Sequence, residues 1–254
     1  MEPVSVYRKK YVIGINEVDF TQKLKQSALF GYFQDIASHA VLNLNIGINE
    51  LIERFHVTWV LVRIRADIVR NPGWNEEITL ETWPQEPGRL EFERDFLVTD
   101  GQGNVIIRAV STWVIMDVDT REVKKSELIH FKYPSFKKER AMDCRLGRLK
   151  PSGTPEAAYK RIIGYSDVDM NGHLNNSKYV DFIMDCFTIE NHRQYEVRSI
   201  EVNYLSEALP GETLVLRREL SEINANHIYI DGVNEAGDKA VFRARLEIGP
   251  RITP

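Results

Sequence analysis

The chain has 254 residues, of which 43% are hydrophobic and 28% are charged, and its formal net charge is -4. This composition is typical of an ordinary globular protein and excludes a disordered or fibrous chain; the slightly acidic balance argues against a general nucleic-acid binder, which would be strongly basic. The two cysteines have no partners at metal-ligand spacing, the start lacks the apolar core of a signal peptide, and no apolar run approaches the ~18 residues of a membrane span. We therefore expect an intracellular, cytoplasmic protein without a membrane span.

The first half of the sequence predicts a short strand, one long helix and then several antiparallel strands. Apolar residues recur at steps of three and four from Leu29 to Leu44, which is the spacing of one buried helical face. Apolar and polar residues alternate after that point, and this period of two predicts strands. The strands expected from it cover residues 60–68, 78–83 and 90–98.

A segment rich in basic residues, proline and glycine, residues 132–155, predicts an interdomain linker. The helix expected after it has its apolar face from Tyr179 to Phe187 and Asn175 or Asn176 as its N-cap. The strands expected next cover residues 200–204, 214–220, 228–230 and 240–248. One helix per half cannot build a doubly wound sheet, so the predicted fold class is α+β, with an antiparallel sheet packed on a long helix in each half.

The two halves resemble each other at a fixed offset. Residues 12–20, VIGINEVDF, align without a gap with residues 162–170, IIGYSDVDM, at an offset of 150 residues (162 minus 12). Two turns also resemble each other, residues 71–74 (NPGW) and residues 209–212 (LPGE). A match that includes Gly and Asp favours a duplication over chance similarity between two amphipathic segments. It predicts two copies of one module, residues 1–131 and 156–254, joined by the linker of residues 132–155.

One short stretch distinguishes the two copies. Residues 21–23, TQK, of the first copy are replaced by residues 171–173, NGH, in the second. In an extended segment Asp169, Asn171 and His173 would lie on one side of the chain, directly before a helix. A polar turn with asparagine caps has the same composition and needs no catalysis. Spacing alone does not choose between these interpretations, because Asp-x-Asn-x-His has no mechanism of its own.

Three stretches make the sequence resemble the acyl-acyl carrier protein (acyl-ACP) thioesterase family, the plant and bacterial enzymes that release free fatty acids from acyl carrier protein. Residues 166–179, SDVDMNGHLNNSKY, are similar to the family's Asp-x-Asn-x-His-Val-Asn-Asn-x-Lys-Tyr signature. Residues 200–208, IEVNYLSEA, stand in place of its short strand that ends in an acidic residue. Residues 113–121, WVIMDVDTR, resemble the Trp-Val-x-Met-x-x-Asp-Thr-Arg stretch that closes the family's first half.

The resemblance implies a tandem double hotdog, in which each module is a long helix wrapped by a curved antiparallel sheet. The first module would house the acyl chain. The second would carry the catalytic residues: Asp169, Asn171 and His173 match the family's catalytic run, and Glu207 falls where members carry the acidic catalytic residue. Plant members have a cysteine directly after that glutamate, whereas this chain has Ala208. A cysteine nucleophile at this place is therefore impossible here.

The resemblance also implies the reaction partner. The expected substrate is an acyl carrier protein carrying a fatty acyl phosphopantetheine, with no cofactor, no metal and no nucleic acid, and a homodimer is left open. Basic residues of the linker, together with Arg63 and Arg65, could meet the acidic carrier protein. A solvated charged face explains these bases equally well.

Thioester hydrolysis needs an activated water, a stabilised oxyanion and a thiolate that leaves. We expect Glu207, partly desolvated beside an acyl tunnel, to act as the general base on water, with its pKa raised by burial; direct attack by its carboxylate through an anhydride is the alternative. His173 would hold the water or share the base role. Asn171 would orient the water or the carbonyl, and Asp169 would fix the loop. The oxyanion would lie near N–H groups at the helix start after Asn175.

Two other functions remain open at this stage. The first is an acyl-CoA thioesterase of the same fold. The second is a non-catalytic acyl-binding hotdog protein, although a protein that only senses acyl chains needs no general base, so the four polar residues argue against it.

Overall fold

The computed structural model describes residues 2–129, 135–137, 139–150, 155–220, 227–237 and 239–251. Of the predicted linker, Lys132, Pro134, Lys138 and residues 151–154 lie outside the described residues. The contacts of the chain divide it into two compact units. The first unit consists of Met1–Leu24, Gly31–Ile64 and Val69–Leu146, and the second of Lys25–Phe30, Arg65–Ile68 and Gly147–Pro254.

The first half forms an antiparallel sheet and a long helix. Its elements are β1 (Tyr7–Val12), α1 (Gln26–Asn43), α2 (Ile48–Phe55), β2 (Val57–Ile68), β3 (Glu77–Pro84), β4 (Phe92–Asp100), β5 (Val105–Asp117) and β6 (Val123–Lys124). The strand order is β1-β3-β4-β5-β2, and β6 pairs with β5. The pairs β1–β3, β3–β4 and β4–β5 are antiparallel.

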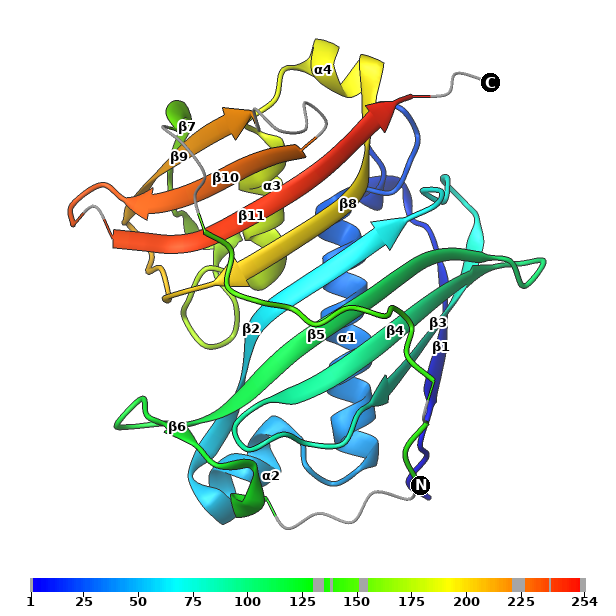
Figure 1. The fold of residues 1–254 in the computed structure, drawn as a ribbon, viewed down its shortest axis with the longest axis vertical. Helices are drawn as coiled ribbons and strands as arrows, with labels where there is room; N and C mark the ends of the chain where they lie inside the picture. Colours follow the sequence, from blue (N-terminus) through cyan, green and yellow to red (C-terminus); the bar gives the residue numbers. More distant parts are fainter. Residues whose placement is uncertain are drawn as a thin grey trace. The chain divides into compact units, whose positions relative to one another are not determined.

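The second half repeats this connectivity. Its elements are β7 (Glu156–Ile162), α3 (Asn176–Met184), α4 (Ile189–Gln194), β8 (Tyr195–Tyr204), β9 (Thr213–Leu220), β10 (His227–Asn234) and β11 (Lys239–Pro250). The strand order is β7-β9-β10-β11-β8, with antiparallel pairing throughout. In each half the first strand pairs with the third, so the predicted duplication and the α+β double hotdog fold are confirmed (Figure 1).

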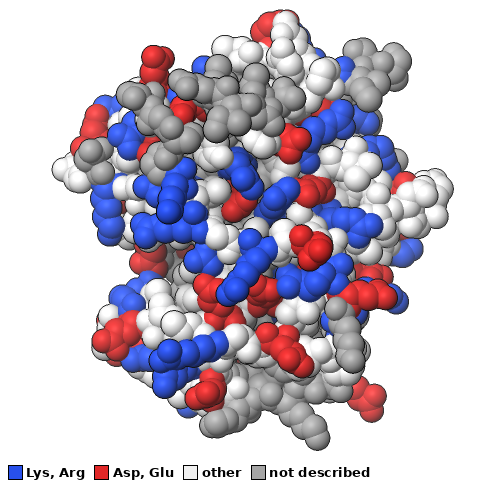
Figure 2. Space-filling view, in the orientation of Figure 1, with Lys and Arg blue, Asp and Glu red and all other residues white. Residues whose placement is uncertain are grey.

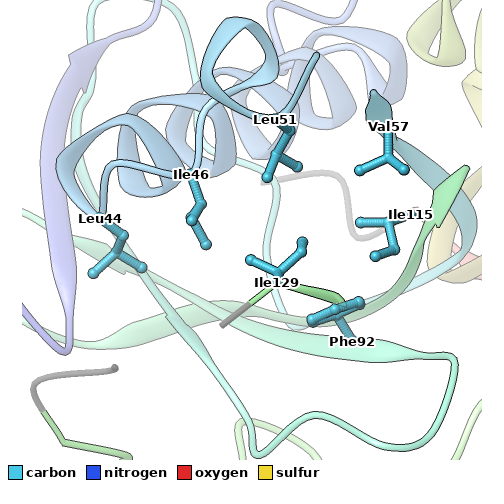
Figure 3. Close-up of a cluster of buried hydrophobic side chains, with 7 residues drawn as sticks. All are labelled: Leu44, Ile46, Leu51, Val57, Phe92, Ile115 and Ile129. Carbon is cyan, nitrogen blue, oxygen red and sulfur yellow. The ribbon is translucent and has the colours of Figure 1, made fainter. Parts of the chain in front are cut away.

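Helix α1 packs against its sheet through the apolar face that the sequence predicts. All residues of that face are at most 4% exposed: Leu29, Phe33, Ile36, Ala37, Ala40 and Leu44. The ring of Phe33 lies 4.9 Å from that of Phe96 in β4, centroid to centroid. Beyond the end of α1 a second cluster continues the core under α2, and Figure 3 shows its side chains converging: Leu44, Ile46, Leu51, Val57, Phe92, Ile115 and Ile129. Each such side chain contributes about 1.5–3 kcal/mol by leaving water.

Helix α3 is shorter than the sequence predicts, because it ends at Met184 rather than continuing to Phe187. The N–H groups of Cys186 and Phe187 bond to carbonyls three residues back, which closes turns instead of an α-helix. Thr188 then caps the next helix, α4, by accepting a hydrogen bond from the N–H of Asn191. The face of α3 packs on its own sheet: Tyr179 makes an edge contact with Phe242 of β11, at 5.4 Å between ring centroids.

The described part of the predicted linker before Gly147 is packed on the sheet of the first unit. Trp83 donates its indole N–H to the carbonyl of Glu139 at 3.1 Å, and the side chains of Ala141 and Met142 pack against Trp83 in a buried cluster. Arg140 pairs with Asp95, whose side chain is 0% exposed, at 3.0 Å. Burial raises the pKa of Asp95, and the Arg140 charge offsets part of that rise. Residues 139–146 are therefore a fixed strap rather than a free tether.

None of the helices within the described ranges is long and apolar enough to cross a membrane.

Gly232 offers a test of the second sheet. It lies opposite Phe242 in the β10–β11 pairing, and a Cβ added to it would overlap the fully buried ring of Phe242. Gly232→Ala should therefore lower the free energy of unfolding by about 1–3 kcal/mol, because a filled core tolerates no extra methyl group. Urea unfolding measures the loss. Gly101→Ala is the control, since its Cβ would meet nothing within 4 Å, and equal stability of the two variants would contradict the packing described.

Candidate active site

The segment that carries the predicted catalytic run is a tight turn before α3. The N–H of Asp169 donates to the carbonyl of His173 at 2.8 Å, and the N–H of Gly172 donates to the carbonyl of Asp169 at 3.1 Å. The carboxylate of Asp169 accepts from the N–H groups of Asn171 and His173 at 2.8 and 3.3 Å. Of the two interpretations that the sequence left open for this segment, the backbone is thus that of a polar turn and not of an extended segment. A glycine at position 172 suits the turn, because its φ is +81°.

The structure brings His173 and Glu207 together. Glu207 lies in the loop after β8, and His173 Nε2 is 3.4 Å from Glu207 Oε2. The two loops are joined by a main-chain hydrogen bond of 2.9 Å from the N–H of Leu174 to the carbonyl of Ala208. The side chains of His173 and Glu207 are 28% and 42% exposed, so the protein itself does not bury Glu207 as the sequence interpretation expects.

The other two predicted residues differ in their surroundings. The Asp169 side chain is half-buried and faces the amides of its own turn. Asn171 is exposed. Geometry thus gives Asp169 the role of holding the turn, and it leaves the Asn171 amide open to a bound substrate.

The start of α3 has few amides to offer to an oxyanion. Asn175 is the N-cap, as predicted, and its side chain accepts from the N–H of Ser177 at 2.9 Å. The N–H of Lys178 donates to the carbonyl of Asn175 at 2.8 Å. These two bonds use the N–H groups of Ser177 and Lys178. Of the first three N–H groups of the helix, they leave that of Asn176 to bind a ligand.

The first half contains the same turn with different side chains. The N–H of Asp19 donates to the carbonyl of Lys23 at 2.9 Å, and the Asp19 carboxylate accepts from the N–H groups of Thr21 and Lys23 at 2.7 and 3.4 Å. Gln22 has φ +59° at the position equivalent to Gly172. Asp19 and Asp169 therefore do the same structural work, and Lys23 stands where the second half has His173.

The later turns align at a different offset from the one the sequence suggests. Ile13 donates to the carbonyl of Glu76, and Ile163 donates to the carbonyl of Glu212, so the offset here is 136 residues (212 minus 76). The alignment of residues 71–74 with residues 209–212, an offset of 138, is therefore wrong by two residues. In the corrected register Asn71, which is buried, stands in the place of Glu207.

Two residues next to this site, Tyr204 and Tyr179, are not among the site residues that the sequence predicts. The hydroxyl of Tyr204 donates to the carbonyl of Asn176 at 3.0 Å, and the ring of Tyr179 makes an edge contact with that of Tyr204 at 5.3 Å. Burial raises the pKa of both hydroxyls. The signal was present in the sequence: Leu29 is the counterpart of Tyr179 at the offset of 150, and Ile68 is the counterpart of Tyr204 at the corrected offset of 136.

Neither cysteine is placed to act as a nucleophile. Cys186 is 6% exposed, and burial raises the pKa of its thiol to about 12. Cys186 therefore packs as a small hydrophobic residue. Cys144 lies in the strap, half-buried. Across the part of the chain that the structure describes, no three His, Cys, Asp or Glu side chains gather as a metal-binding group.

Two family models match the chain. The acyl-ACP thioesterase N-terminal domain matches residues 4–127, and the acyl-ACP thioesterase C-terminal domain matches residues 156–243. The chain is 26% identical over 223 residues to oleoyl-acyl carrier protein thioesterase 2 of Arabidopsis thaliana, an alignment that covers 82% of this chain and 61% of that protein. It is 25% identical to dodecanoyl-[acyl-carrier-protein] hydrolase of Cinnamomum camphora, with 98% and 69% covered. The chain spans about three fifths of the length of the oleoyl-specific relatives.

Solved structures share the fold. An acyl-ACP thioesterase from Bacteroides thetaiotaomicron superposes with a TM-score of 0.85 at 24% identity, covering 96% of this chain and 98% of that one. A 12:0-ACP thioesterase from Umbellularia californica superposes with a TM-score of 0.86 at 23% identity, covering 98% of each chain.

The equivalent turns predict equal stability effects. Asp169→Ala and Asp19→Ala each remove a carboxylate that accepts from two backbone amides. Each substitution should lower the free energy of unfolding by about 1–2 kcal/mol, which chemical denaturation measures. A loss at Asp19 with no loss at Asp169 would contradict the structural role given to the second carboxylate.

Proposed function

The chain belongs to the acyl-ACP thioesterase family, and on that premise we propose that it hydrolyses the thioester of fatty acyl-acyl carrier protein, releasing free fatty acid and holo-acyl carrier protein in fatty acid biosynthesis. The observation that carries the proposal is the pair formed by His173 and Glu207, with 3.4 Å between Nε2 and Oε2. An imidazole and a carboxylate this close together can both contact one water molecule and act on it as general base and hydrogen-bond partner. Their partial exposure leaves both accessible to a substrate.

The proposed nucleophile is water. Glu207, supported by His173, takes a proton from the water as its oxygen attacks the thioester carbonyl carbon. The C–S bond then breaks, and the pantetheine sulfur leaves as a thiolate. The thiolate accepts the proton that Glu207 took from the water. Because a thiolate leaves readily, the general base carries most of the chemical demand. In the protein alone the Glu207 side chain is 42% exposed. Any further removal of water from its carboxylate therefore comes from the bound acyl substrate.

The remaining predicted residues have supporting roles in this proposal. Asn171, exposed and two residues before His173, orients the water or the thioester carbonyl through its amide. Asp169 holds the turn that carries His173. The Asn176 N–H at the positive end of α3 is the donor proposed for the oxyanion.

The proposed partner is acyl carrier protein, yet several of the basic side chains expected to meet it already have partners within the protein. Arg63 pairs with Glu91 and Arg65 with Asp67, each at 2.9 Å. Lys137 Nζ lies 3.9 Å from the centroid of the Trp83 ring. Figure 2 shows acidic and basic side chains interspersed on one face of the molecule. These contacts favour a solvated charged face over a dedicated basic dock at these positions.

The paired bases also change how docking can be tested. Reversing the charge of Arg140 would leave the buried Asp95 beside a like charge, so that variant would lose stability for reasons unrelated to docking. Cytoplasmic location, a homodimer and an acyl-binding first module (residues 1–131) stay predictions.

Substitutions at the pair test the chemistry. Glu207→Gln and His173→Ala should each lower kcat by about 10²–10⁴-fold, because each removes a group that moves or holds a proton. Circular dichroism should show both variants folded. Lys23→Ala is the matched control, since Lys23 occupies the position of His173 in the first half and should keep the wild-type kcat. Near-wild-type turnover by Glu207→Gln would end the assignment of Glu207 as the base.

One acyl chain presented on two carriers tests the substrate. We expect kcat/KM for the acyl carrier protein thioester to exceed that for the CoA thioester by about tenfold or more, because only the protein carrier adds surface contacts. Equal efficiencies would identify an acyl-CoA thioesterase instead. Tight acyl binding without turnover would identify an acyl-binding protein. A panel of chain lengths on the better carrier then gives the acyl preference.

A further inference from the structure

Two tyrosines tie together the segments that carry the proposed catalytic pair. Tyr204 is the last residue of β8, three positions before Glu207, and Asn176 is the first residue of α3, three positions after His173. The hydroxyl of Tyr204 donates to the carbonyl of Asn176 at 3.0 Å. This bond therefore joins the two segments at a residue before Glu207, while the bond from Leu174 to Ala208 joins them at a residue after it. In the other segment both bonds use residues that follow His173.

The ring of Tyr204 is held in place by Tyr179. Tyr179, on α3, is 3% exposed. Its ring meets that of Tyr204 edge-on, with 5.3 Å between centroids and 75° between planes, and it meets Phe242 of β11 in the same manner at 5.4 Å. Such edge contacts fix ring orientation as well as burying surface. The Tyr204 hydroxyl consequently has one direction in which to donate.

The first half lacks this tie although it keeps the main-chain scaffold. The bond from Leu24 to Pro72, at 2.9 Å, is the counterpart of that from Leu174 to Ala208. Ile68, the last residue of β2, stands in the place of Tyr204, and neither it nor Leu29, the counterpart of Tyr179, has a hydroxyl. The turn and the loop thus form without tyrosines. The second half, which carries His173 and Glu207, adds the side-chain hydrogen bond from Tyr204 to Asn176.

Placing a hydroxyl at this strand end has a cost that an apolar residue avoids. A hydroxyl withdrawn from water costs free energy unless it finds a partner. Isoleucine meets the packing need in the first half without that cost. The presence of a hydroxyl at residue 204 is therefore better explained by its hydrogen bond to Asn176 than by the burial of the tyrosine ring.

We propose that Tyr204 is a positioning residue, whose hydroxyl fixes the start of α3 to the end of β8 and thereby sets the separation of His173 and Glu207; this rests on the proposed function. Tyr204 acts through these residues and contacts no reacting atom. It also orients Asn176, whose N–H is the proposed oxyanion donor. Small displacements of such groups are costly, since a misplacement of about 1 Å can lower a rate by about 100-fold.

The test is Tyr204→Phe, which keeps the ring and removes the hydroxyl. We expect kcat to fall by about 10–100-fold with KM changed less than about twofold. Tyr11→Phe is the matched control: the Tyr11 hydroxyl donates to Asp35 at 2.6 Å in the first unit, so this variant also loses one partly buried tyrosine hydrogen bond. It should lose stability and keep its kcat.

A double-mutant cycle separates positioning from general stability. If Tyr204 acts through Glu207, Tyr204→Phe should lower the residual rate of Glu207→Gln by a much smaller factor than it lowers the wild-type rate. An equal factor in both backgrounds, or a wild-type kcat in Tyr204→Phe, overturns the proposal. Should Tyr204→Phe not fold, Tyr179→Leu decides in its place: it installs the residue of the first half and removes the ring that orients Tyr204, and an unchanged kcat in that variant overturns the proposal. A fully active Glu207→Gln would refute the proposed function itself, a distinct outcome.

Discussion

The main-chain hydrogen bond from the N–H of Leu174 to the carbonyl of Ala208 joins the two segments that carry His173 and Glu207. Because it uses backbone groups, it is indifferent to the side chains on either loop. The same bond joins Leu24 to Pro72 in the first half, where a proline can accept because only its carbonyl is needed. The scaffold of the site is thus a property of the fold, and the chemistry is a property of the side chains that the scaffold displays.

The turns of Asp19 and Asp169 show the same division between scaffold and chemistry. Asp19 and Asp169 accept from equivalent amides, so a carboxylate at this position is required by the turn in both halves. An aspartate beside a histidine in a family signature therefore does not need a role in proton transfer. Comparing two copies within one chain separates such scaffold residues from Glu207 and His173, whose counterparts Asn71 and Lys23 cannot form the same pair.

The sequence predicted the pattern of elements well, because period and composition follow from which side of each element is buried. The face from Leu29 to Leu44 and most strands are found where expected. Which face of β2 is buried at its start does not follow from the sequence: Leu61 is 6% exposed, while its neighbours Val60 and Val62 are only half-buried. An all-apolar stretch carries no alternation, so only packing decides which side chains face inward.

The register of the turns could not be predicted from residue identities alone. Similarity placed Gly73 opposite Gly211, but the backbone places Asn75, with φ +61°, opposite Gly211, with φ +86°. Asparagine is one of the few residues besides glycine that adopt this conformation readily, so the constraint is conserved in geometry and not in residue type. The two-residue error concealed that Asn71 replaces Glu207. The contact between His173 and Glu207 likewise depends on loops far apart in sequence.

The corrected loop also explains why the alanine after Glu207 removes no chemistry. Ala208 is 0% exposed, and its carbonyl is held by Leu174. A side chain at this position points into the protein while its neighbour Glu207 is exposed. A cysteine placed there would be buried, and burial in apolar surroundings raises the pKa of a thiol and disfavours the thiolate. Residue 208 is thus a packing position, which agrees with the proposal that the nucleophile is water.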